Sequence, residues 1–408
     1  MKYLLTPKHI IDCVSSDTIS DHTVVIDDNK IENIIPNNAV GDSIYSSYEH
    51  LEFPNGTLMP GFIEMHSHMH ISGDHENYEQ LITENDETLL IRASAAVRSA
   101  LLSGVTTMRD LGAKNSISLA IRAACQQDMI PGPTMIIAGA PITTTGGHCH
   151  MFGIEVNTKD EVVKAVRDQF HAGVDWIKIM ATGGNFTPGT NPKRPQYDLD
   201  ILTAAVSDAH RLGMKIAAHC HATAGVEIAA TAGVDNIVHC SWNAELAGEL
   251  YDYKPEIADL IAKNGIYVDP TLALNHLNEL RGRKKPAPAL SNPTLRMEIL
   301  HDMWDRGIKF VTGMDSGMTN AYFSDFAFIP QVMVEKMGIP EMDAILSSTK
   351  ISAECLGLSD TIGMIKPGMI ADIVITDGNP LSDIKMLHHV DTILHSGKIV
   401  KKNYQNLV

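Results

Sequence analysis

The sequence predicts an α/β protein in which a (β/α)8 TIM barrel is inserted in a small composite β-sandwich domain. Two observations predict this class. Between residues 58 and 357, short β-rich runs alternate with amphipathic helical runs, which is typical of parallel strands joined by crossover helices. The flanking segments, residues 1–57 and 358–408, consist instead of short alternating strands and turns. We therefore expect a barrel domain at 58–357 and a β domain built from both ends.

The amino-terminal segment supplies the first part of the β domain. It contains "TVVIDDNKIENIIP", which is typical of short strands and turns without helices. The carboxy-terminal segment contains "ADIVITDGNPLSDI" and "VDTILHSGKIVKK", which have the same character. We expect the two segments to pair with each other, which would bring both termini together beside the barrel.

Eight β-rich runs form the expected barrel, and this number favours a closed barrel over an open sheet. Helices are expected between them, for example at 87–102 and 160–171, where the dipeptides "SG" and "AG" follow as glycine caps would. The expected strands are Phe62–His66, Val105–Asp110, Thr134–Ala140, Val174–Met180, Lys215–His219, Asn236–His239, Tyr267–Pro270 and Phe310–Asp315.

Composition restricts the partners and the compartment. The chain has 408 residues, 44% of them hydrophobic, and a formal charge of −17, which argues against binding nucleic acid or an anionic membrane through the overall field. No signal peptide and no run of about 18 apolar residues is apparent, so we expect a cytoplasmic protein. We also expect it to form a homo-oligomer and to act on a small molecule. The six cysteines include no CxxC pair, so neither a disulfide framework nor a thiolate zinc cluster is indicated.

The ends of the expected strands carry an unusual set of side chains. Active sites of such barrels lie at the carboxyl ends of the strands. A lone histidine there is more often a hydrogen-bonded structural residue, but the coincidence of several favours a metal site, and imidazole with carboxylate suits zinc or its first-row neighbours. The candidate ligands are His66, His68, Lys178, His219, His239 and Asp315.

Lys178 stands at the centre of the apolar run "VDWIKIMATGG". Burying an unpaired ammonium there would be costly. If burial lowers its pKa, the neutral amine can react with carbon dioxide, and the two carbamate oxygens could bridge two cations. The alternative is a lysine that extends its ammonium to the end of the strand.

These motifs resemble those of the amidohydrolase superfamily, in the branch that holds imidazolonepropionase-like proteins, Xaa-Pro dipeptidases and arginine carboxypeptidases. The similarity lies in "GFIEMHSHMH", "WIKIMATGG", "AAHCHA", "NIVHC" and "VTGMDSG" and covers essentially the whole chain. It implies two divalent ions, zinc being the expected metal: His66, His68 and Asp315 would bind one, and His219 and His239 the other. Carbamylated Lys178 would bridge both. The usual aspartate two residues before the first ligand is Glu64 here, which affects the support of the ligands more than ligation.

The resemblance also implies an activity. The expected reaction is hydrolysis of an amide C–N bond in a dipeptide or N-acyl amino acid by a hydroxide shared between the ions, with Asp315 as the catalytic proton shuttle. His148 and His221 would bind the substrate carboxylate, helped by Lys193, Arg194 or the "RGRKK" loop.

Several alternatives stay open. A cyclic amide, a lactone, a carbamate or an aryl amide could replace the linear amide as the substrate. A deaminase is disfavoured, because the glutamate that relatives of that class place three residues after the strand histidine is Ala222 here. An inactive scaffold is disfavoured because all six ligands are present.

Overall fold

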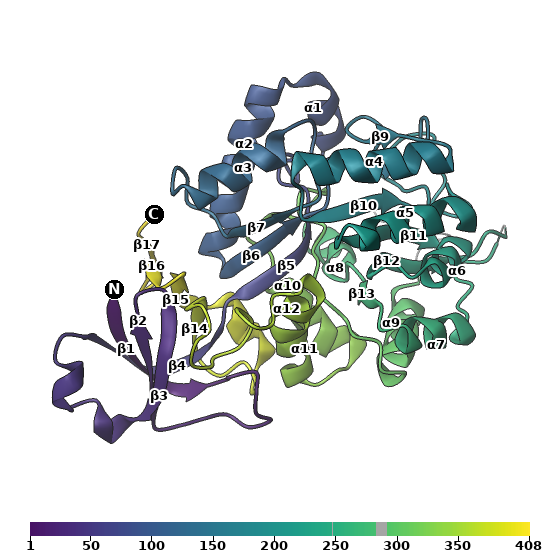
Figure 1. Ribbon diagram of the computed structural model, residues 1–408. Coiled ribbons are helices and arrows are strands. Elements are labelled where there is room, and N and C mark those ends of the chain that lie inside the picture. Colours follow the sequence, from purple (N-terminus) through teal and green to yellow (C-terminus); the bar gives the residue numbers. More distant parts are fainter. Residues whose placement is uncertain (247, 283–291) are drawn as a thin grey trace.

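The computed structural model describes residues 1–246, 248–282 and 292–408 and confirms the α/β class, with several sheets. Helices cover the central strands, and both ends of the chain lie together at a separate sheet (Figure 1). The helices are α1 (Asn77–Thr83), α2 (Asp86–Leu102), α3 (Ile117–Gln126), α4 (Lys159–Ala172), α5 (Leu199–Arg211), α6 (Thr223–Ala232), α7 (Pro255–Lys263), α8 (Ala273–Leu280), α9 (Pro293–Asp305), α10 (Phe328–Val332), α11 (Glu341–Ser347) and α12 (Lys350–Leu356).

The two ends of the chain share one sheet, in the order β17-β16-β15-β14-β4-β1-β2-β3. The alternating apolar residues of β1, β2 and β14 pack together with those of β4 into a small core of their own. The strands are β1 (Lys2–Ile10), β2 (His22–Asp27), β3 (Lys30–Pro36), β4 (Glu49–Pro60), β14 (Ile373–Asp377), β15 (Val390–His395), β16 (Lys398–Lys402) and β17 (Gln405–Asn406).

The central strands form two further sheets, in which neighbours run parallel. One has the order β5-β6-β7 and the other β13-β12-β11-β10-β8-β9. Their bounds are β5 (Phe62–Ser67), β6 (Val105–Asp110), β7 (Thr134–Ile137), β8 (Ile142–Thr143), β9 (Ile154–Glu155), β10 (Trp176–Met180), β11 (Lys215–Ala222), β12 (Asn236–Asn243) and β13 (Tyr267–Asp269).

Backbone hydrogen bonds join the edges of these two sheets. The amide of Asp175, just before β10, donates to the carbonyl of Ile137 in β7 at 2.8 Å. On the other side, Val311 donates to Val268 in β13, and Met65 in β5 donates to Thr312, both at 2.9 Å. The segment after α9 therefore lies between β13 and β5 and connects them.

Two expected strands differ in the structure. Residues 310–315 do not form a regular strand: Phe310 makes one parallel bridge to Val268. The amide of Met314 donates instead to the Glu64 carboxylate, so a side chain replaces the neighbouring strand as acceptor. The third strand ends at Ile137 rather than Ala140, and Gly139 then takes a φ of 66°, which leaves the β region.

Helix boundaries follow local signals. Thr158 and Glu161 form a reciprocal capping box at the start of α4, and Gly173 ends it with φ 81°. Asn85 accepts a hydrogen bond from the amide of Thr88 at the start of α2. In the described ranges, no helix is both long and apolar enough to cross a bilayer.

Candidate metal centre

The first group of candidate ligands lies where β5 ends. His66 and His68 both direct Nε2 toward the same oxygen of Asp315, Oδ1, at 3.4 and 3.5 Å. The ligand-capable atoms of these three residues lie within 4.8 Å of one another, and the side chains are buried. Two imidazoles and a carboxylate at this spacing can hold one ion of the zinc type.

The second group lies on two neighbouring parallel strands of the other central sheet. His219 in β11 and His239 in β12 have ring centroids 4.6 Å apart. His221 completes a cluster with them, again within 4.8 Å, and its ring stacks on that of His239 at 4.4 Å. The rings of His66 and His239 are 5.3 Å apart, so the two groups are neighbours.

Lys178 lies in β10, which pairs with β11, the strand that carries His219. Its side chain is 1% exposed, and within the described ranges its Nζ has no hydrogen-bond partner. Burial lowers the pKa of this amine, whereas the nearby Asp315 carboxylate opposes that shift. Burial, and next the Lys178 charge, lowers the pKa of His66, and the same lysine also lowers the pKa of buried His239.

This unpartnered ammonium tests the fit of the implied metal site. An unpaired buried cation is unfavourable next to imidazoles that are themselves held neutral. A carbamate on Lys178 would replace this cation with an anion, close to the imidazole and carboxylate donors that suit divalent ions. The residues present therefore fit a pair of ions bridged by a modified lysine.

Second contacts orient the imidazoles, and neutral imidazole donates from one nitrogen only. His66 Nδ1 lies 3.0 Å from Asp269 Oδ2, His68 Nδ1 lies 2.9 Å from the Gly112 carbonyl, and both therefore present Nε2 as an acceptor. His219 is anchored the opposite way, with Nε2 3.3 Å from the Gly183 carbonyl, which leaves Nδ1 free to bind an ion.

The two expected substrate-binding histidines lie beside the second group. The ring of His148 is 4.5 Å from that of His219, its side chain is buried, and its Nδ1 has no partner within the described chain. The adjoining Gly184 leaves room for this ring, because an added Cβ would lie 2.4 Å from it. His221 binds Ser241 Oγ through Nδ1 at 2.8 Å.

The basic loops give less support to a carboxylate anchor. Lys193 Nζ donates to the carbonyl of Glu249, and Arg194 forms an ion pair with Glu245 at 3.4 Å. Most of the "RGRKK" loop, residues 283–285 of it, lies outside the described residues. A cavity of about 630 Å³ between α8, α9 and α10 is lined by residues such as His276, Met297 and Lys336 and by none of the candidate ligands.

Glu64 supports the centre rather than binding in it. Its Oε1 accepts hydrogen bonds from the amides of His66, at 2.9 Å, and Met314, at 3.0 Å. Burial raises its pKa well above the usual range, and these two donors oppose the shift. Glu64 thus links β5 to the segment that carries Asp315.

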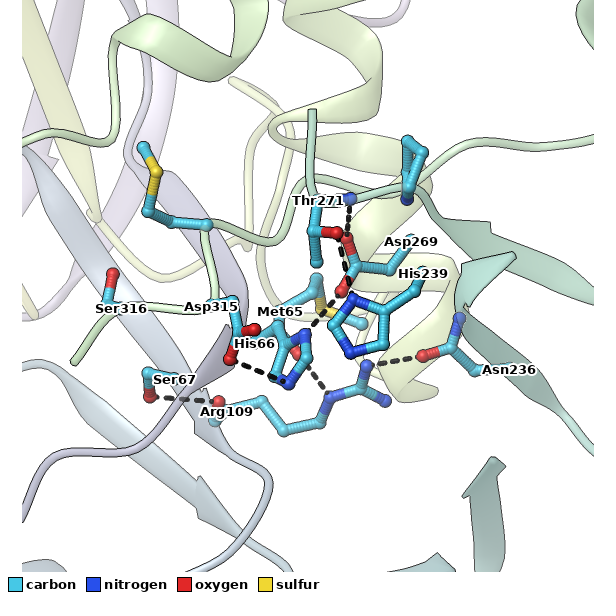
Figure 2. Close-up of polar contacts among 12 residues, drawn as sticks. Met65, His66, Ser67, Arg109, Asn236, His239, Asp269, Thr271, Asp315 and Ser316 are labelled. Atoms are coloured by element: carbon cyan, nitrogen blue, oxygen red, sulfur yellow. Dashed lines mark hydrogen bonds and ion pairs between the residues drawn. The ribbon is translucent and has the colours of Figure 1, made fainter. Parts of the chain in front are cut away.

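Sequence reasoning missed three residues that contact the candidate ligands: Asp269, Thr271 and Arg296. Asp269 and Thr271 lie at the end of β13, a strand that supplies no candidate ligand, and contact His66 and His239 (Figure 2). Arg296 in α9 donates to the carbonyl of His239 at 2.8 Å. The strand-end rule that identified the histidines could have identified the "DPT" of residues 269–271 as well.

Comparisons with known proteins agree with this geometry. A family model described as "Amidohydrolase family" matches residues 57–400. Ochratoxinase from Aspergillus niger is 26% identical over 376 residues, covering 84% of this chain and 75% of that protein. The crystal structure of a Xaa-Pro dipeptidase with methionine bound in its active site has a TM-score of 0.87 at 28% identity and covers 98% of this chain and 100% of that one. The crystal structure of A. niger ochratoxinase has a TM-score of 0.83 at 22% identity, covers 98% and 96%, and supports the fold alone.

Proposed function

From the premise that the chain belongs to the amidohydrolase family, we propose that it hydrolyses the amide bond of a small substrate with a free carboxylate, a dipeptide or an N-acyl amino acid, at a binuclear metal centre. That the chain is a hydrolase, and an amide-bond hydrolase in particular, follows from the family and its prolidase and ochratoxinase neighbours. The observation that carries the finer proposal is Lys178, a buried ammonium without a partner in the described chain, on the strand that pairs with the one carrying His219.

The proposed ligands divide into two sets. His66, His68 and Asp315 would hold one ion and His219 and His239 the other, with carbamylated Lys178 between them. Divalent ions of the zinc type supply Lewis acidity, which lowers the pKa of water and polarises a carbonyl. Zinc is the metal we propose, since imidazole and carboxylate suit it.

Asp315 is the proposed proton carrier. Its carboxylate is buried, burial raises its pKa, and the positive charge of Lys178 opposes that shift. A carboxylate of raised pKa can accept a proton from the attacking water and return it to the leaving nitrogen. The candidate histidines are each held by a second contact and would act as ligands rather than as bases.

The closed (β/α)8 barrel and its boundaries, 58–357 between 1–57 and 358–408, belong to the same proposal. The hydrogen bonds from Asp175 to Ile137 and from Met65 to Thr312 support closure, because they join the edges of the two central sheets. The homo-oligomer and the cytoplasmic location stay predictions.

A free carboxylate is proposed as the anchor of the substrate because the rings of His148 and His221 lie 4.5 and 4.6 Å from that of His219 and His148 Nδ1 has no partner within the described chain. Two structural neighbours were solved with ligands that carry such a group, methionine and N-methylphosphonate-L-proline. A carboxylate held there would orient the adjacent amide over the ligands. Cyclic amides, lactones, carbamates and aryl amides are the alternative substrates.

A paired hydrolysis screen tests the proposal. Zinc-loaded protein is incubated with dipeptides and N-acyl amino acids, each beside its carboxamide, and metal content is measured in parallel. We expect about two ions per chain and cleavage of the free acids well above that of the amides. Equal cleavage of both forms would refute the carboxylate anchor, and fewer than two ions with full activity would refute the binuclear centre.

A further inference from the structure

Asp269 and Thr271, at the end of β13, connect the two groups of candidate ligands (Figure 2). Asp269 Oδ2 lies 3.0 Å from His66 Nδ1, and Thr271 Oγ1 lies 3.0 Å from His239 Nδ1. The two contacts are themselves joined, because the amide of Thr271 donates to Asp269 Oδ1 at 3.1 Å. One short segment therefore contacts one imidazole of each group.

Asp269 occupies a space shaped for its carboxylate. The side chain is fully buried, and the neighbouring Gly313 lies so close that an added Cβ would be 2.3 Å from Asp269 Oδ2. Only glycine at position 313 leaves this carboxylate in place. The two oxygens of Asp269 accept from different donors, the ring of His66 and the amide of Thr271.

The backbone around Thr271 is held in an uncommon conformation. Thr271 has φ 47° and His239 has φ 68°, although neither is glycine and threonine is β-branched. Arg296 fixes both turns, since its guanidinium donates to the carbonyls of His239, at 2.8 Å, and Pro270, at 3.0 Å. Arg296 is itself buried in α9. The positions of His239 and Thr271 are thus set together.

We propose that Asp269 and Thr271 are positioning residues: the Asp269 carboxylate, which can only accept, fixes the Nδ1–H tautomer and the ring orientation of His66, and the Thr271 hydroxyl fixes the ring orientation of His239. With its proton on Nδ1, the His66 ring turns an unprotonated Nε2 to the centre, as an ion requires. β13, which supplies no candidate ligand, thereby positions both metal sites. This inference rests on the proposed binuclear centre.

The two contacts differ in chemistry, so their loss has different effects. A buried carboxylate raises the basicity of the imidazole to which it is bonded, whereas a neutral hydroxyl only orients it. Asp269→Asn retains the shape but leaves one of two donors without an acceptor. Thr271→Val retains the shape and removes only the hydroxyl, while Thr271→Ser keeps the hydroxyl and serves as the conservative variant.

Zinc titration against a competing chromophoric chelator, on chelator-stripped protein, tests the inference. His219→Ala disrupts the second group and leaves the first intact, whereas His68→Ala disrupts the first and leaves the second intact. Zinc binding to each site is thus measured alone. Asp269→Asn should weaken zinc binding about 10–100-fold in the His219→Ala protein, the usual cost of losing such a partner. Thr271→Val should weaken it in the His68→Ala protein, and Thr271→Ser should restore it. Asp372→Asn and Thr392→Val are the matched controls, because both residues are buried in the β domain, Asp372 just before β14 and Thr392 in β15. They should leave zinc affinity unchanged at both sites.

The outcomes separate the two levels of the argument. If otherwise unaltered protein binds fewer than two zinc ions, the proposed centre fails. If it binds two and neither Asp269→Asn nor Thr271→Val changes affinity, the positioning role fails while the centre stands. An equal loss in the control variants would also overturn it, because the effect would then be general destabilisation. If Asp269→Asn does not fold, the comparison of Thr271→Val with Thr271→Ser decides alone.

Discussion

Replacing Lys178 by methionine should affect the metal-free and the metal-loaded protein in opposite directions. Lys178→Met keeps the length of the side chain and removes its amine. The native ammonium is buried and lacks a hydrogen-bond partner in the described chain, and the Asp315 carboxylate is the group that most favours its charge. In the metal-loaded protein the same substitution removes the proposed bridge. We therefore expect a more stable metal-free protein that no longer forms the binuclear centre.

The size and pH dependence of the gain follow from burial. A pKa lowered from 10.5 to about 8 corresponds to about 3 kcal/mol by which burial disfavours the charged amine, and Lys178→Met removes this cost. Burial lowers the pKa of Lys178 to about 8 from an ordinary value of 10.5. Because the unfolded chain then binds more protons than the native one, the stability of the unsubstituted metal-free protein rises with pH between these values. Lys178→Met should lack that rise, so its advantage is largest near or below pH 8.

Urea unfolding in chelator and carbon-dioxide-free buffer from pH 7 to 10.5 measures the effect. Lys215→Met is the matched control, because Lys215 in the adjacent β11 already donates to the Cys355 carbonyl and should behave oppositely or neutrally. If the free energy of unfolding rises equally with pH in Lys178→Met and in the unsubstituted protein, Lys178 is not a buried amine with a lowered pKa. Retention of two tightly bound ions and full activity by Lys178→Met would refute the bridge.

Three further perturbations test other parts of the site. Asp315→Asn should lower kcat by about two or more orders of magnitude. Burial raises the pKa of Asp315 to about 7 from 3.8, so the metal-free protein should lose stability as the pH rises from about 4 to 7. Asp315→Asn should lose less stability over this range, as urea titrations at pH 4 and 7 would show. Gly313→Ala should cost about 1–3 kcal/mol through its contact with Asp269, whereas Gly41→Ala, with open space around it, should be neutral in the same assay. Arg296→Met should lower the free energy of unfolding by about 1–3 kcal/mol for each carbonyl that loses its donor, and it should weaken zinc binding at the second group. A loss of stability no larger than that caused by Arg167→Met, on the exposed side of α4, would contradict this.

The sequence predicted the candidate site better than the path of the chain through it. The histidines at positions 66, 219 and 239 could be placed because side chains alternate along a strand and the carboxyl ends of parallel strands meet. The structure brings them together with His68 and Asp315 in two clusters. Residues 310–315 could not be predicted correctly, because the partner of the Met314 amide is the carboxylate of Glu64, 250 residues earlier in the chain.

The missed residues have the same origin. Asp269 contacts His66 across a separation of 203 residues, and nothing in the local sequence signals such a partner. The positive φ values of His239 and Asp315 were equally unpredictable, since only a few per cent of residues other than glycine adopt that region, even though aspartate and histidine do so more often than most. Local rules thus identified which residue types stand at the strand ends, while the contacts that orient them depend on the assembled sheets.

The backbone of the centre is held in conformations that cost free energy. His239, Thr271 and Asp315 have φ values of 68°, 47° and 60°, and each such residue costs on the order of 1–3 kcal/mol. Buried hydrogen bonds maintain them: Arg296 binds the carbonyls beside His239 and Thr271, and Glu64 binds the amide just before Asp315. A sequence selected for stability alone would place glycine at these positions, where φ above zero is free of strain. An ion held by His239 and Asp315, as proposed, would bind only the folded state and would thereby offset this strain.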